Sequence, residues 1–221
     1  MNFSISSIEA RILGCLIEKE ATTPDVYPLT LNSLLTACNQ KSNREPVMNL
    51  TDDDLLPALD NLGDRTLVST WKSDRNRMIK YQHKLHHRVF DEFNFTLPEL
   101  AVLGVLFLRG PQTVGEIRSR CARIHDFDKL DEVEGLLAAL EDNADGPYVK
   151  MLPRQAGRKE PRYAHLFCGE PDETAIAATA IQSAANGTQS RIEALELEVT
   201  ELKSELRELT QRFEEFAKQF E

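Results

Sequence analysis

Residues 96–109 read TLPELAVLGVLFLR and form the most apolar run of the chain. Residues 6–19, SSIEARILGCLIEK, align with this run without gaps at an offset of 90 residues. The identical pairs are Glu9 and Glu99, Leu13 and Leu103, Gly14 and Gly104, and Leu16 and Leu106. Both runs carry apolar residues at helical spacing, and the segments that follow them also match. One module of about eighty residues is therefore expected to occur twice.

Both copies predict the same order of elements. In the first copy, helices are expected over residues 7–20, 31–38 and 52–62, followed by strands over 67–71 and 78–83. In the second copy, helices over 97–108, 114–123 and 130–141 precede strands over 148–152 and 162–167. Each expected helix is preceded by a residue that can cap its N-terminus. This residue is Asp128 before the last helix and a Ser or Thr before the others. Three helices and a hairpin are the order of a winged helix-turn-helix module, so the expected fold is mainly α with small β-hairpins (α+β).

The expected organisation is two tandem winged helix-turn-helix domains, a linker and a C-terminal coiled-coil helix. The domains span residues 1–92 and 93–170, the Ala-rich helical linker 171–190, and the coiled-coil helix 191–221. Apolar residues alternate at spacings of three and four through the last segment, over about 43 Å of helix. They are Ile192, Leu195, Val199, Leu202, Leu206, Leu209, Phe213, Phe216 and Phe220. This pattern predicts a homodimer through a parallel coil; the alternative is one helix folded back on its own domain.

Six consecutive polar residues without an acid follow the second expected helix. They are Asn39, Gln40, Lys41, Ser42, Asn43 and Arg44. One interpretation is a solvated loop. The other is a DNA contact, because Asn and Gln pair with adenine, Arg pairs with guanine, and Lys and Ser suit phosphates. The sequence leaves both open.

Both expected hairpins are basic. Residues 72–88 hold six Lys or Arg side chains and one acid. The candidate DNA-binding residues there are Lys72, Arg75, Arg77 and Lys80, and in the second hairpin they are Arg154, Arg158, Lys159 and Arg162. The net charge of −10 does not exclude nucleic acid, because residues 171–221 supply −6 of it. The third helix of each copy, however, is acidic, which disfavours its insertion into a phosphate-lined groove.

No pattern of residues indicates an enzyme or a cofactor. The chain has no Gly-rich phosphate loop and no nucleophile elbow, and its four cysteines form no CxxC pair. His83, His86 and His87 form the one histidine cluster, but a strand would place His86 on the opposite face from the other two, and a set of acids and cysteines that would complete a site is not expected beside them. A metal site is therefore not expected. Without a long apolar run or a signal peptide, a cytoplasmic protein with no membrane contact is expected.

Three motifs resemble signature stretches of the YceH family of bacterial proteins. They are YPLTLNSLL at 27–35, ACNQKSNREPVM at 37–48 and GRKEPRYAHLF at 157–167. The resemblance covers about residues 3–169 and implies a tandem winged-helix fold in a cytoplasmic bacterial protein. It brings no catalytic or metal-binding residues with it.

Two functions remain. The first is a DNA-binding protein, of the transcriptional-regulator kind, whose basic wings and polar segment contact duplex DNA as a dimer. The alternative is a protein–protein interaction or assembly module that does not bind DNA. The sequence indicates no small-molecule ligand.

Overall fold

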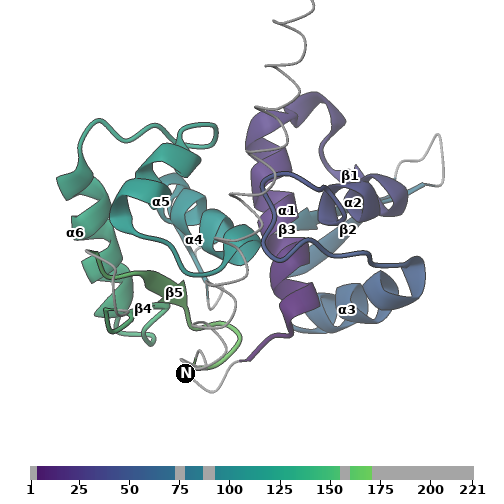
Figure 1. Ribbon diagram of the computed structural model, residues 1–221. Coiled ribbons are helices and arrows are strands. Elements are labelled where there is room, and N and C mark those ends of the chain that lie inside the picture. The colour runs from purple at the N-terminus through teal and green to yellow at the C-terminus, as the bar shows by residue number, and fades with distance from the viewer. Residues whose placement is uncertain (1–3, 73–77, 87–92, 155–159, 171–221) are drawn as a thin grey trace, which may run out of the picture. The chain divides into compact units, whose positions relative to one another are not determined.

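The first repeat folds as three helices and a small sheet. The computed structural model describes residues 4–72, 78–86, 93–154 and 160–170. Helix α1 (Ser7–Thr22) begins at a capping box in which Ser6 and Glu9 each bind the other's backbone N–H. A short 3₁₀ helix, η1 (Pro24–Val26), leads to strand β1 (Leu29–Thr30) and helix α2 (Leu31–Cys38). Helix α3 (Asp52–Asp64) and strands β2 (Val68–Lys72) and β3 (Ile79–His83) complete the repeat (Figure 1).

The sheet of the first repeat has the antiparallel order β1-β3-β2. Strand β3 is central because it pairs with β2 along its whole length and with β1 through Leu29 and Tyr81. Strand β1 thereby fixes the start of α2 to the hairpin. The sequence did not predict this strand, since two residues are too short for an alternating pattern.

The second repeat has the same order of elements with shorter connections. Helices α4 (Leu97–Arg109), α5 (Val114–Cys121) and α6 (Leu130–Glu141) precede strands β4 (Val149–Met151) and β5 (Tyr163–His165), which pair in antiparallel fashion. An isolated bridge joins Gln112 to Tyr163 and takes the place that β1 has in the first repeat. Helix α6 begins after Lys129 and not after Asp128, and no side chain caps it, so the predicted Asp128 cap was wrong.

Helices α1 and α4 pack directly against each other through two glycines (Figure 1). A Cβ atom on Gly14 would lie 2.8 Å from Cγ of Leu108 and 3.0 Å from Cβ of Phe107. A Cβ atom on Gly104 would lie 3.0 Å from Cγ2 of Ile17. Each glycine therefore lets the facing helix approach closely. At the offset of 90 residues, Gly14 corresponds to Gly104 and Ile17 to Phe107, so the two contacts are equivalent.

Because of this contact, the buried apolar residues of both repeats form one continuous cluster. Leu13 and Leu16 of α1 and Leu103 and Leu106 of α4 are fully buried within it. Residues up to Pro171 accordingly form one compact unit. The expected linker and coiled-coil helix, residues 171–221, lie outside the described residues. Within the described residues, no helix has both the length and the apolar character needed to cross a membrane.

Candidate nucleic-acid interface

The polar segment after α2 is held by its own side chains. Asn39 donates from Nδ2 to the carbonyl of Leu50 at 2.8 Å and accepts the Leu50 N–H at Oδ1 at 2.7 Å. This reciprocal pair closes the loop between α2 and α3. Asn39 therefore has a structural role, and its amide is not available to pair with an adenine edge in this conformation.

Arg44 points into the protein instead of toward solvent. Its side chain is fully buried and binds Glu18 of α1, with Nη2 to Oε2 at 2.6 Å and Nη1 to Oε1 at 3.3 Å. Its Nε donates to the carbonyl of Ala37 at 3.0 Å, and Gln40 Oε1 accepts from Nη2 at 3.0 Å. Burial by itself would raise the pKa of Glu18, but the Arg44 hydrogen bonds and charge outweigh burial and lower it. Arg44 and Glu18 thus form a largely buried ion pair to which Gln40 adds a hydrogen bond, an arrangement that engages Arg44 and Gln40 away from base edges.

The middle of the segment does reach the surface. Lys41, Ser42 and Asn43 are exposed, and Asn43 has a positive φ of 61°. The Asn43 side chain accepts a hydrogen bond from Arg109 at the end of α4. The backbone N–H of Glu45 also donates to the carbonyl of Leu108 at 2.8 Å. The polar segment of the first repeat is therefore joined to the second repeat at this point.

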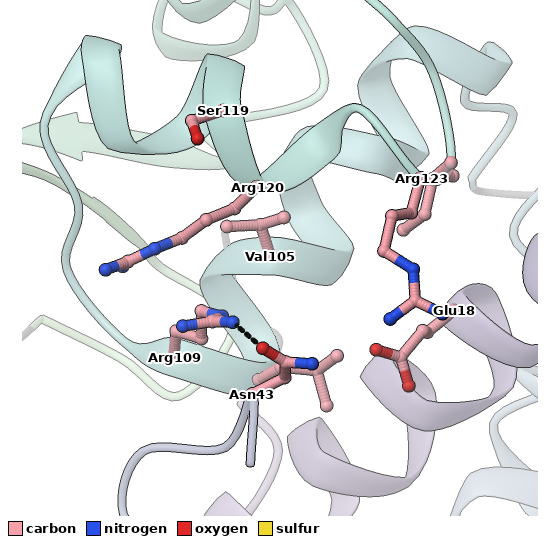
Figure 2. Close-up of a pocket in the computed structure, with 9 residues that line it drawn as sticks. Glu18, Asn43, Val105, Arg109, Ser119, Arg120 and Arg123 are labelled. Carbon is pink, nitrogen blue, oxygen red and sulfur yellow. Dashed lines mark hydrogen bonds between the residues drawn. The ribbon is translucent and has the colours of Figure 1, made fainter. Parts of the chain in front are cut away.

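A cleft of about 170 Å³ lies where the two repeats meet. Its polar lining comes from Glu18, Asn43, Arg109, Ser119, Arg120 and Arg123, and Val105 and Leu108 supply apolar surface. Figure 2 shows Arg123 extending toward Glu18, whereas the guanidinium groups of Arg109 and Arg120 are both directed to the other side. Three arginines from α4, α5 and the turn after α5 thus surround one small space.

The charges in this cleft are not balanced. Glu18 is already bound by Arg44 at 2.6 Å, and Arg120 reaches Glu116 only at 3.7 Å. Burial and the positive charges of Arg120 and Arg44 lower the pKa of Arg109. Arg123 makes no hydrogen bond or ion pair with the described residues, and it is exposed. An anion such as a phosphate would relieve the repulsion among these cations.

Of the four candidate hairpin cations within the described residues, one is engaged inside the protein. Lys72 and Arg154 are exposed and Lys80 is partly exposed. Arg162 is engaged within the protein, because it donates to the carbonyl of Pro111 at 2.7 Å and to Glu116 at 3.3 Å. The other candidates at the hairpin tips, Arg75, Arg77, Arg158 and Lys159, lie outside the described residues.

The third helix of each repeat exposes acids, as its sequence indicates. The exposed acids are Asp52, Asp53, Asp54, Asp60 and Asp64 on α3, and Asp131, Glu132 and Glu134 on α6. Leu55, Leu59 and Leu62 of α3 face the core. Neither helix presents a basic surface on its solvent side.

The sequence reasoning missed the cleft arginines. Residues 118–123 read RSRCAR, so three cations in six residues were visible in the sequence. Arg118 is committed to the carbonyls of Phe127 and Asp128, at 2.9 Å each, which leaves Arg120 and Arg123 for the cleft. Arg109 ends a helix that is apolar from Leu100 to Leu108, and the packing of α4 against the polar segment places it beside Asn43.

The described residues define a small α+β protein in which two similar units share a core and an arginine-lined cleft. A family model described as "Protein of unknown function, DUF480" matches residues 5–158. The UPF0502 protein YceH of Salmonella newport (strain SL254) is 46% identical over 185 residues, covering 84% of this chain and 86% of that protein. The YceH proteins of Salmonella heidelberg (strain SL476) and Salmonella paratyphi B match at the same identity and coverage. The chain belongs to this family.

Proposed function

We propose that this chain is a tandem winged-helix protein that binds duplex DNA through phosphate contacts. The contacts come from the arginine-lined cleft and the exposed side chains of the adjoining polar segment, together with the hairpins. The order of elements supports the fold assignment, since a strand before α2 joins a hairpin that follows α3. The bridge from Gln112 to Tyr163 repeats that connection in the second copy.

One observation carries the proposal: Arg109, Arg120 and Arg123 line one cleft together with exposed Asn43, although the chain is acidic as a whole. Guanidinium groups bind phosphate oxygens with two parallel hydrogen bonds, and a space of about 170 Å³ admits one such group. Phosphate contacts of this kind position a protein on DNA and carry no base information. The proposed binding is therefore weakly dependent on DNA sequence.

The third helices have no part in this mode of binding. Their exposed carboxylates would meet the phosphates that line the major groove, and the repulsion would oppose insertion. The hydrogen bonds of Asn39 to Leu50 and the burial of Arg44 also remove both from the list of base-reading side chains. The DNA-facing residues that remain in the described part of the chain are cations suited to phosphates.

The test is fluorescence anisotropy with a random-sequence duplex at about 50 and about 200 mM salt. The affinity of the wild type should fall steeply between the two salt concentrations, because phosphate neutralisation releases counterions. The double variant Arg120→Ala/Arg123→Ala should bind all sequences more weakly, and its salt slope should be smaller by about one unit per lost contact. Lys129→Ala, which removes an exposed cation at the start of α6, is the matched control.

A second variant separates the hairpins from the cleft. Replacing Arg75, Arg77, Arg158 and Lys159 with Ala should also weaken binding without a change in sequence preference. If the wild type shows no salt-dependent binding, or if neither variant differs from it, the DNA-binding proposal is wrong.

The alternative function, a protein-interaction module, has its own supporting observations. The first hairpin exposes Trp71, Met78 and Ile79 at 48%, 52% and 41%, and aromatic and Met side chains are enriched in protein interfaces. The acidic surface of α3 suits a basic partner. If the chain is a protein-interaction module, a photo-crosslinking amino acid in place of Asp60 should crosslink to a discrete protein in cells. If the chain binds DNA, the same amino acid in place of Lys41 should crosslink to nucleic acid.

A further inference from the structure

A second polar cluster lies where the end of α1 meets the end of β3, apart from the arginine-lined cleft. Nε2 of His83 is 2.8 Å from Oε2 of Glu20, and Nε2 of His86 is 2.9 Å from the same oxygen. The ligand atoms of these three residues all lie within 4.8 Å of one another. The two imidazole rings meet edge to face, with centroids 5.0 Å apart.

The fold brings these residues together in a way that the sequence did not predict. Strand β3 ends at His83, so the strict alternation of faces does not extend to His86. The chain bends there, which places both rings beside α1. Glu20 is 63 residues before His83 in the sequence, and it stands in the last turn of α1. The acid that a histidine cluster needs therefore comes from another element.

The three side chains differ in their access to solvent. The His83 side chain is fully buried, whereas those of Glu20 and His86 are 34% and 24% exposed. The backbone N–H of His83 donates to the hydroxyl of Tyr27 at 3.0 Å, which fixes the chain at the buried ligand. One histidine is thus held in place from the inside, and the other two groups border solvent.

We propose that Glu20, His83 and His86 form a binding site for a divalent metal ion of the zinc type. Two imidazole nitrogens and one carboxylate oxygen are a donor set that Zn²⁺ accepts, with a fourth position left for water or an external ligand. The solvent-facing side of Glu20 and His86 provides that position. The site is independent of the DNA-binding proposal.

The ligand atoms must shift to accept the ion, since they now lie within 4.8 Å of one another. Ligands of a tetrahedral zinc site lie roughly 3.3 Å apart, given bond lengths of about 2.0 to 2.1 Å. The Glu20 to histidine distances of 2.8 and 2.9 Å must therefore widen by a few tenths of an ångström. Leu85 N–H donates to Nδ1 of His83 at a long 3.4 Å. This weak bond is given up when the ion takes Nε2 and the ring proton moves to Nδ1.

The carboxylate is already in the form that a metal requires. A carboxylate with an ordinary pKa of about 4.3 is ionised at neutral pH. Metal ligands must be deprotonated, so this group gives up no proton at neutral pH. An ion here would connect α1 to the sheet of the first repeat and stabilise both.

The test uses the full chain, stripped with a chelator and titrated with Co²⁺ and Zn²⁺. Co²⁺ should give the visible absorption bands of a four-coordinate site at one ion per chain, and Zn²⁺ should displace it and raise Tm. His86→Ala and Glu20→Gln should weaken binding by about 10-fold or more, since changes to a metal's outer partners alone cost about that much. His125→Ala, which removes a histidine elsewhere, should bind Co²⁺ as the wild type does.

Circular dichroism of each variant verifies its fold, and Glu20→Gln keeps the size and shape of the side chain. The proposal is overturned if the wild type shows neither the absorption bands with Co²⁺ nor the increase in Tm with Zn²⁺. It is equally overturned if folded Glu20→Gln and His86→Ala bind as tightly as the wild type, because the ion would then lie elsewhere.

Discussion

At the scale of single residues, the polar segment shows how position in the fold decides the role of a side chain. Six polar residues without an acid read from the sequence as surface, and Lys41 and Ser42 are exposed. Arg44 is instead buried because Glu18, 26 residues earlier, meets it from α1. A long-range partner of this kind leaves no local pattern, so sequence reasoning had no means of separating Arg44 from its exposed neighbours.

Arg44→Ala should be strongly destabilising. It leaves the Glu18 carboxylate largely buried without its partner, and breaking a buried pair in this way costs about 3–5 kcal/mol. Lys41→Ala, an exposed cation three residues earlier, should change the free energy of unfolding by about 0.5 kcal/mol or less. Urea denaturation followed by circular dichroism measures both. Equal effects in the two variants would contradict the structural role of Arg44.

The same pair predicts a dependence of stability on pH. The pKa of Glu18 is lowered in the folded protein, below its unfolded value of about 4.3. The contribution of the ionised Glu18 carboxylate to the stability of the fold is therefore fully present above about pH 4.3. It is lost as the pH falls through the pKa of Glu18 in the folded protein. The urea concentration at the midpoint of unfolding should decrease as the pH is lowered from 7. This decrease should be smaller in Glu18→Gln than in the wild type. Parallel profiles for the two proteins would show that Glu18 does not contribute.

At the scale of elements, local signals predicted the helices well and the contacts between them poorly. Capping boxes at Ser6, Thr96 and Thr113 start helices where the sequence places them. The sequence did not predict strand β1, which needs β3 as a partner, or the arginine-lined cleft, which needs α4 and α5 packed against the polar segment. These features depend on residues far apart in the chain, and their spacing in the sequence carries no signal.

Gly14→Ala tests the contact between α1 and α4. The added Cβ would lie 2.8 Å from Leu108 Cγ, so the helices must separate or repack. We expect a cost of about 1–3 kcal/mol, typical of overpacking in a core. Gly135→Ala in α6 is the matched control, because no atom lies within 4 Å of its added Cβ.

The control should have the opposite sign. Ala in a helix interior is favoured over Gly by about 0.5–1 kcal/mol, so Gly135→Ala should raise the denaturation midpoint. If Gly14→Ala raised it as well, the close approach of the two helices would be disproved.

At the scale of the whole molecule, we propose that the chain is a dimer through residues 192–220. This segment lies outside the described residues. Its sequence has nine apolar residues at spacings that alternate between three and four without interruption. Two such stripes bury each other in a parallel coil. Sedimentation at micromolar protein concentration should give a dimer for the full chain and a monomer for a chain ending at Gly169. Two monomers would favour the alternative in which the helix packs within its own chain.

The paired glycines of α1 and α4 also bear on how the chain arose. Gly14 faces Phe107 while Gly104 faces Ile17, and each of these contacts is the other one with the two copies exchanged. Contacts that are reciprocal in this way are those of a twofold homodimer. We infer that a single module with this helix, as an ancestor of the duplicated chain, would pair with itself through the same contacts. The two copies differ in detail: Arg120 and Arg123 belong to the second alone and His86 to the first, although the second strand of each hairpin ends at a histidine, His83 or His165.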